Sequence, residues 1–75
     1  MNGLEGVIWR EWVEAMTPLT EAQRQYARQL VIAGSDQAVT PADCRSLLLS
    51  SAAAAAELTP DLAAHTAAAM QRVTS

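Results

Sequence analysis

The chain has 75 residues, which is enough for one domain at most. Its formal net charge of −3 argues against nucleic acid, whose binding depends on Lys and Arg neutralising phosphates, and against an anionic membrane surface. One Cys and one His exclude both an internal disulfide and a four-ligand Cys/His zinc site.

The apolar content consists largely of small side chains. Hydrophobic residues are 51% of the chain, but 16 of them are Ala, so few large side chains remain for a core. A chain of this size rarely obtains more than about 3–5 kcal/mol from one core. We therefore expect further stability to come from a protein partner or from self-association as a homodimer.

The segment 3–16 predicts an amphipathic helix. It contains both tryptophans, and its charged residues lie on the opposite face from them. One interpretation is that Trp9 and Trp12 fill the core of a protein that has no Phe. The other is that Trp9, which is nearer the edge of the apolar face, anchors a partner, since Trp is enriched at interface hot spots. Val7 projects away from the apolar face and is expected to be exposed. The apolar face itself comprises Leu4, Ile8, Trp9, Trp12, Val13, Ala15 and Met16.

The segment 20–33 predicts a second helix. Thr17-Pro18 ends the first helix, Thr20 and Gln23 form a capping box, and Gly34 is expected to end the second helix in a left-handed conformation. The expected buried face is Leu19, Ala22, Tyr26, Leu30 and Ala33, and the polar face is Glu21, Arg24, Gln25, Arg28 and Gln29. Ile32 falls among these polar residues, and this arrangement indicates a partner patch that includes Arg24 and Arg28.

The central helix is predicted over 41–58. Thr40 is a suitable cap, Pro41 suits the first helical position, and Asp43 suits the positive end of the helix dipole. Its apolar residues cover more than half of the circumference, so it needs neighbours on at least two sides. We expect the leucines at 47–49 to supply hydrophobic mass and the alanines at 52–56 to allow a close helix crossing.

The last helix is predicted over 60–73, after a third Thr-Pro pair, Thr59-Pro60. Its expected apolar stripe is Leu62, Thr66, Ala69, Met70 and Val73, and Asp61, His65 and Arg72 share the opposite side. No segment contains the roughly 18 apolar residues that a membrane span needs, and the charged N-terminal segment is no signal peptide. We therefore expect a cytoplasmic protein.

The chain has little that could perform catalysis. Cys44 and His65 are the only conventional nucleophile–base pair, and they belong to an apolar and a polar helix face respectively. The chain contains no GxGxxG, GK[ST], CxxC or HExxH motif. We expect no enzyme activity, no cofactor and no metal site.

These observations predict an all-α fold, a small three- or four-helix bundle, in a non-catalytic protein–protein interaction module. Such a protein would be an adaptor or inhibitor that docks on a larger protein machine, as small proteins of phages and mobile elements do. The candidate contact residues are Trp9, Trp12, Arg24, Arg28 and Ile32. One alternative is a self-associating structural subunit.

The other alternative is a helix-turn-helix DNA-binding regulator, in which the central helix would read the bases. The loop before that helix is longer than the usual turn of about three to four residues. The central helix offers Arg45 but otherwise mainly Leu, Ser and Ala, whereas base reading favours Arg, Lys, Asn and Gln. The Arg/Gln face of the second helix is the main support for this alternative.

Overall fold

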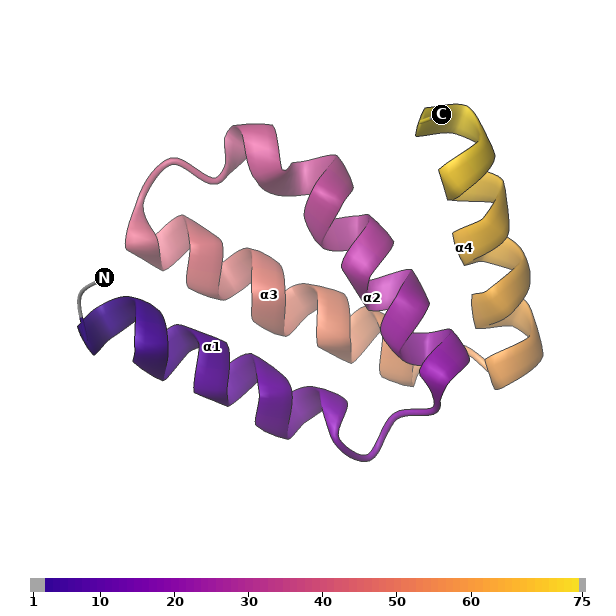
Figure 1. Ribbon diagram of the computed structural model, residues 1–75, viewed down its shortest axis with the longest axis horizontal. Helices are drawn as coiled ribbons and strands as arrows, with labels where there is room; N and C mark the ends of the chain where they lie inside the picture. The colour runs from indigo at the N-terminus through magenta and orange to yellow at the C-terminus, as the bar shows by residue number, and fades with distance from the viewer. Residues whose placement is uncertain (1–2, 75) are drawn as a thin grey trace.

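Over residues 3–74, the computed structural model contains four α-helices, which confirms the all-α prediction (Figure 1). They are α1 (Gly3–Met16), α2 (Glu21–Gly34), α3 (Pro41–Ala56) and α4 (Pro60–Thr74), and a short 3₁₀ helix, η1 (Ser35–Gln37), follows α2. The structure describes the backbone of residues 3–74 and the side chains of residues 9–73, so the side chain of Val7 lies outside the described residues. Within this part of the chain, no helix is long and apolar enough to cross a bilayer.

Threonine caps define where three of the helices begin. The Thr20 hydroxyl accepts a hydrogen bond from the Gln23 amide at 3.2 Å, and the Gln23 side chain accepts one from the Thr20 amide at 2.9 Å. Thr40 and Asp43 form a second reciprocal box, in addition to the dipole role that we expected for Asp43. At α4, the Thr59 hydroxyl accepts from the Leu62 amide at 3.2 Å. Each such cap stabilises its helix by about 1 kcal/mol.

The expectation of a left-handed Gly34 is wrong. Gly34 has φ −97° and ψ −2°, so the chain stays right-handed and α2 continues into η1. Glycine here leaves room for the side chain of Leu47 on α3. A Cβ atom at Gly34 would lie only 2.8 Å from Cδ1 of Leu47, which is too close for an unshifted contact.

The helices form an open row in the order α1, α3, α2, α4 (Figure 1). α3 packs against both α1 and α2, as its wide apolar surface predicts, and α4 packs on α2. The overall dimensions are 36 × 27 × 17 Å. The shortest of these dimensions is less than half of the longest.

Small residues occupy the most buried positions. Ala27, Ala55 and Ala63 are fully buried, whereas Leu47, Leu48 and Leu49 are only partly buried. No large side chain of the described residues is fully buried. The core is thus centred on close contacts between alanines, with Trp12, Met16 and Leu19 as its largest buried members. The leucines at 47–49 supply less of the core than we expected.

Two predicted helix faces are corrected by the structure. On α2, Gln29 is buried at 7% exposure although we placed it on the polar face, and Ala33 is exposed although we placed it in the core. On α4, the buried residues are Ala63 and Ala67, whereas the predicted stripe is exposed at Leu62 and Val73 and only partly buried at Thr66, Ala69 and Met70. On α4, the small side chains of Ala63 and Ala67 permit the close approach of α2, and the bulkier Leu62 and Val73 lie at the rim.

The open row leaves a large surface. The solvent-accessible area is 4970 Å², whereas a compact monomer of this mass has about 4,450 Å². The radius of gyration is 12.4 Å, against about 11.3 Å for a typical domain of this length. The molecule thus exposes roughly 500 Å² more than a compact monomer by this scaling.

Candidate partner-binding groove

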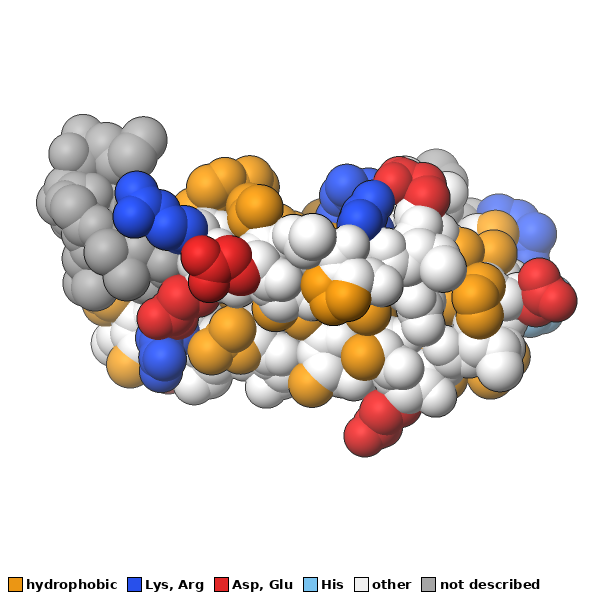
Figure 2. Space-filling view, turned by 90° about the horizontal axis from the view of Figure 1, so that it is seen from below, with side chains coloured by type: hydrophobic (Ala, Val, Ile, Leu, Met, Phe, Trp, Pro, Cys, Tyr) orange, Lys and Arg blue, Asp and Glu red, His pale blue; other side chains and the backbone are white. Residues whose placement is uncertain are grey.

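A groove runs between α1 and α2, and we call it the Trp–Arg groove. Its volume is about 240 Å³, and it is lined by Trp9, Trp12, Val13, Met16, Thr17, Arg24 and Arg28. The fold therefore brings together four of the five contact candidates, although they come from two different helices. Seen from the side of α1, the upper edge of the surface is hollowed between hydrophobic side chains and a group of charged ones (Figure 2).

The two tryptophans have different environments. Trp12 is buried at 7% exposure, whereas Trp9 is 59% exposed. Their ring centroids lie 5.2 Å apart at an interplanar angle of 64°, an edge-to-face contact of the kind that adds about 0.5–1.5 kcal/mol beyond area burial. Trp12 therefore belongs to the core, and it supports Trp9 in an exposed position on the groove wall.

Trp12 also carries an unsatisfied polar group. Its Nε1–H is buried and has no hydrogen-bond acceptor among the described residues. A buried donor without a partner costs about 1–3 kcal/mol, and such groups are few in native proteins.

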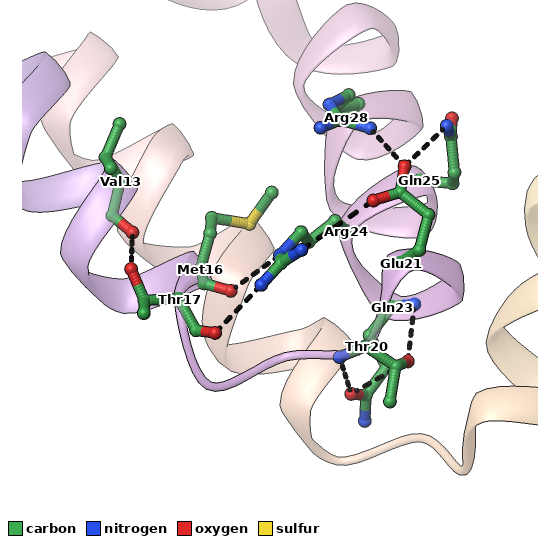
Figure 3. A network of polar contacts seen from close by, with 9 residues as sticks. All are labelled: Val13, Met16, Thr17, Thr20, Glu21, Gln23, Arg24, Gln25 and Arg28. Atoms are coloured by element: carbon green, nitrogen blue, oxygen red, sulfur yellow. Dashed lines mark hydrogen bonds and ion pairs between the residues drawn. The ribbon is translucent and has the colours of Figure 1, made fainter.

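Arg24 lines the groove and is bonded to the end of α1 (Figure 3). Its Nε donates to the carbonyl oxygen of Met16 at 3.0 Å, and its Nη2 donates to that of Thr17 at 2.8 Å. These carbonyls lie at the C-terminal end of α1, where helix carbonyls lack intrahelical donors and where the dipole favours a cation. Arg24 thus fixes α1 relative to α2, which makes it mainly a structural residue of the groove.

Arg28 lies one turn further along α2 and is held less firmly. Its Nη1 lies 3.3 Å from Oε1 of Glu21, which also accepts from Gln25 at 3.1 Å. The hydrogen bond from Arg28, followed by that from Gln25, lowers the pKa of Glu21. Exposed ion pairs of this kind contribute about 0–1 kcal/mol. Because guanidinium carries five donors, Arg28 retains the capacity to bind a second carboxylate.

The remaining candidate and one further residue complete the surface. Ile32 is exposed, as expected, but it is not among the residues that line the groove. Val13 is also exposed and does line it, although the sequence did not single it out. The spacing of Trp9 and Val13, four residues apart on one helix, was the available signal.

Cys44 and His65 are not brought together. The thiol of Cys44 lies 3.8 Å from the carbonyl oxygen of Ala38, in the first turn of α3 and at the opposite end of that helix from α4 (Figure 1). His65 is exposed on α4. Among the described residues, no group of three or more His, Cys, Asp or Glu side chains could hold a metal ion.

No protein-family model, curated protein or solved structure matches this chain.

Proposed function

We propose that this protein is a non-catalytic protein-interaction module, an adaptor or inhibitor that docks on a larger cytoplasmic protein through the Trp–Arg groove. The observation that carries the proposal is the exposed indole of Trp9 in the same groove as the guanidinium of Arg28. Trp and Arg are the residue types most enriched at interface hot spots. A rigid neighbour supports each of them: Trp12 packs on Trp9, and Arg24 fixes the angle between the two helices.

The chemistry of the groove indicates which partner segment it takes. At about 240 Å³ it is smaller than the roughly 300–1,000 Å³ of small-molecule sites, and it suits one or two protein side chains. Trp9 and Val13 supply an apolar wall, and Arg28 supplies a positive charge on the other side. A partner segment with an apolar side chain next to Asp or Glu fits this combination, and a helix laid into the groove is the simplest geometry.

The DNA-binding alternative loses part of its support. It depended on the Arg/Gln face of α2, but Gln29 is buried and Arg24 is bonded to the end of α1. Gln25 and Arg28 both donate to Glu21. These side chains are engaged within the protein and are less suited to reading bases.

Affinity capture from the source cell tests the proposal, with Trp9→Ala and Arg28→Gln as variants and Val39→Ala as the matched control. Val39 is an exposed apolar residue outside the groove. We expect the wild type and Val39→Ala to retain the same protein, and both groove variants to lose it while keeping the wild-type circular dichroism spectrum. Equal capture by Trp9→Ala, or tight retention of DNA instead of protein at moderate salt, would overturn the proposal.

A further inference from the structure

A second apolar surface lies on α4, away from the Trp–Arg groove. Leu62 is 49% exposed and Val73 is 86% exposed, at opposite ends of the helix. A shallow groove of about 310 Å³ lies along the same face and extends to α2, and its lining is Ala33, Thr66, Ala69, Met70 and Val73. We call the residues Leu62, Thr66, Ala69, Met70 and Val73 the α4 stripe.

The packing of α4 on α2 explains why Leu62 and Val73 of this stripe are exposed, whereas Thr66, Ala69 and Met70 are partly buried. Ala63 and Ala67 face α2 and are buried. At about 100° per residue, the centre of the α4 stripe is turned by roughly a quarter of the circumference from these two alanines. A helix has only one face toward a single neighbour, so burial of the alanines leaves Leu62 and Val73 in solvent. The main neighbour of α4 is α2, and nothing in the described chain covers the outer edge.

Asp61 and Arg72 complement a second copy of the same helix. At about 100° per residue, each lies roughly a quarter of the circumference from its neighbour Leu62 or Val73, and not directly opposite the α4 stripe as we expected from the sequence. Asp61 is in the first turn of α4 and Arg72 is in the last turn, about three helical turns apart and therefore on the same side. Among the described residues, neither forms an ion pair within the chain. In an antiparallel pair of α4 helices, Asp61 of each copy would lie beside Arg72 of the other. A parallel pair would instead place like charges together.

We infer that two copies of this protein associate through the α4 stripe, with their α4 helices antiparallel and two symmetric Asp61–Arg72 ion pairs at the rim. The contact is isologous, as in most homodimers, and antiparallel helix dipoles favour it further. Leu62 of one copy lies opposite Val73 of the other in this arrangement. Ala69 lies near the two-fold axis, where a small side chain permits close approach.

The area available indicates a weak dimer. The α4 stripe is one face of a single helix, and contacts that bury less than about 1,000 Å² in total are typically weak or transient. We therefore expect a concentration-dependent equilibrium between monomer and dimer. The surface is distinct from the Trp–Arg groove, so a dimer keeps both grooves open to a partner.

Sedimentation equilibrium of the purified protein over a wide concentration range tests the inference. We expect the wild type to dimerise, and Val73→Ser to weaken the dimer while the exposed control Val39→Ser does not. Arg72→Glu and Asp61→Lys should each weaken self-association by about tenfold, since two rim pairs become repulsive. Mixing these two variants should restore the dimer, because the mixed pair regains both attractive contacts.

The outcomes separate this inference from the proposed function. A wild type that stays monomeric at every concentration overturns it, and so does a dimer that is insensitive to Val73→Ser and to both charge variants. Failure of the mixed variants to pair, when each has the wild-type helical spectrum, rules out the antiparallel arrangement. Trp9→Ala should leave the dimer unchanged, so loss of partner capture and loss of self-association are measured independently.

Discussion

The side-chain amide of Gln23 donates to the carbonyl oxygen of Leu58 at 2.8 Å. The same side chain completes the capping box of α2, where its Oε1 accepts from the Thr20 amide. Gln23 therefore joins the start of α2 to the end of α3, two segments that are 35 residues apart in the chain. It lies at the base of the contact between α2 and α3, where α4 also begins.

Gln23→Glu separates these two roles. Glu keeps the acceptor of the capping box, but it removes the donor to Leu58 and places a carboxylate beside that carbonyl oxygen. We expect a loss of about 1–2 kcal/mol in the free energy of unfolding at neutral pH, the cost of leaving a partly buried acceptor unpaired. Gln23→Ala should cost about 1 kcal/mol more, because it also removes the cap. Urea denaturation measures both, and equal stability of wild type and Gln23→Glu would contradict the role of the Leu58 contact.

Arg24 and Arg28 provide a matched pair of cations on one helix face. Arg24→Lys keeps the charge but loses the forked donation to Met16 and Thr17. We expect it to lower stability by about 1–2 kcal/mol, which corresponds to a fall in Tm of about 4–8 °C for each kcal/mol. Arg28→Lys should change stability by less than about 0.5 kcal/mol, since its pair with Glu21 is exposed. If Arg28→Lys lowered Tm more than Arg24→Lys did in a thermal melt, Arg28 and not Arg24 would be the arginine that stabilises the fold.

The helices and their caps could be predicted because they depend on local sequence. Thr20, Thr40 and Thr59 each precede a helix, and each cap is completed within three residues. The buried faces could not be predicted as well, because they depend on which helices meet. On α4, the apolar pattern favours Leu62 and Val73 as core residues, but the close approach of α2 selects Ala63 and Ala67 instead.

The residues of the candidate groove could be named from their chemical types, but their separate roles required the tertiary structure. The sequence did not decide between core and surface for the tryptophans. The structure buries Trp12 and exposes Trp9. The carbonyl contacts of Arg24 join two helices across the Thr17-Pro18 turn, and no spacing rule predicts them. Ile32 was expected to be exposed on helical periodicity alone, and it is.

Two carboxylates predict how stability depends on pH. A hydrogen bond from Arg28 lowers the pKa of Glu21 below its ordinary 4.5, and the backbone hydrogen bond from Thr40 lowers the pKa of Asp43 below its ordinary 3.8. The unfolded chain binds a proton at each carboxylate more readily than the folded chain does. The stability that each carboxylate contributes is therefore complete above its ordinary pKa, and it is lost as the pH falls through the lowered pKa of the folded state. We expect Tm to decline below about pH 4.5.

Glu21→Gln combined with Asp43→Asn provides the control for this prediction. Both replacements are neutral at every pH and keep side-chain oxygens that can accept hydrogen bonds. The double variant should be less stable than the wild type at pH 7, and its Tm should change less between pH 5 and 3. Thermal melts over this interval measure the difference. If the two proteins have parallel pH profiles, other carboxylates govern the acid sensitivity.

Because Gly34 and Leu47 lie close together, we expect substitutions at these two positions to have coupled effects on stability. Gly34 has an ordinary helical conformation, so Gly34→Ala should gain about 0.4–1 kcal/mol from reduced freedom of the unfolded chain. Against this gain, the new Cβ would lie 2.8 Å from Cδ1 of Leu47. We expect the clash to cancel or exceed the gain in the wild-type background, and the gain to emerge in a Leu47→Ala background, where the opposing methyl group is absent.

A double-mutant cycle measured by urea denaturation gives the coupling between the two sites. We expect about 0.5–2 kcal/mol, with the double variant more stable than the sum of the single changes. Gly34 is a described glycine whose Cβ position meets a side chain of the neighbouring helix, so the test applies there. Additive effects would mean that Leu47 moves aside at no cost. The absence of a side chain at Gly34 would then have no role in how closely α2 and α3 approach.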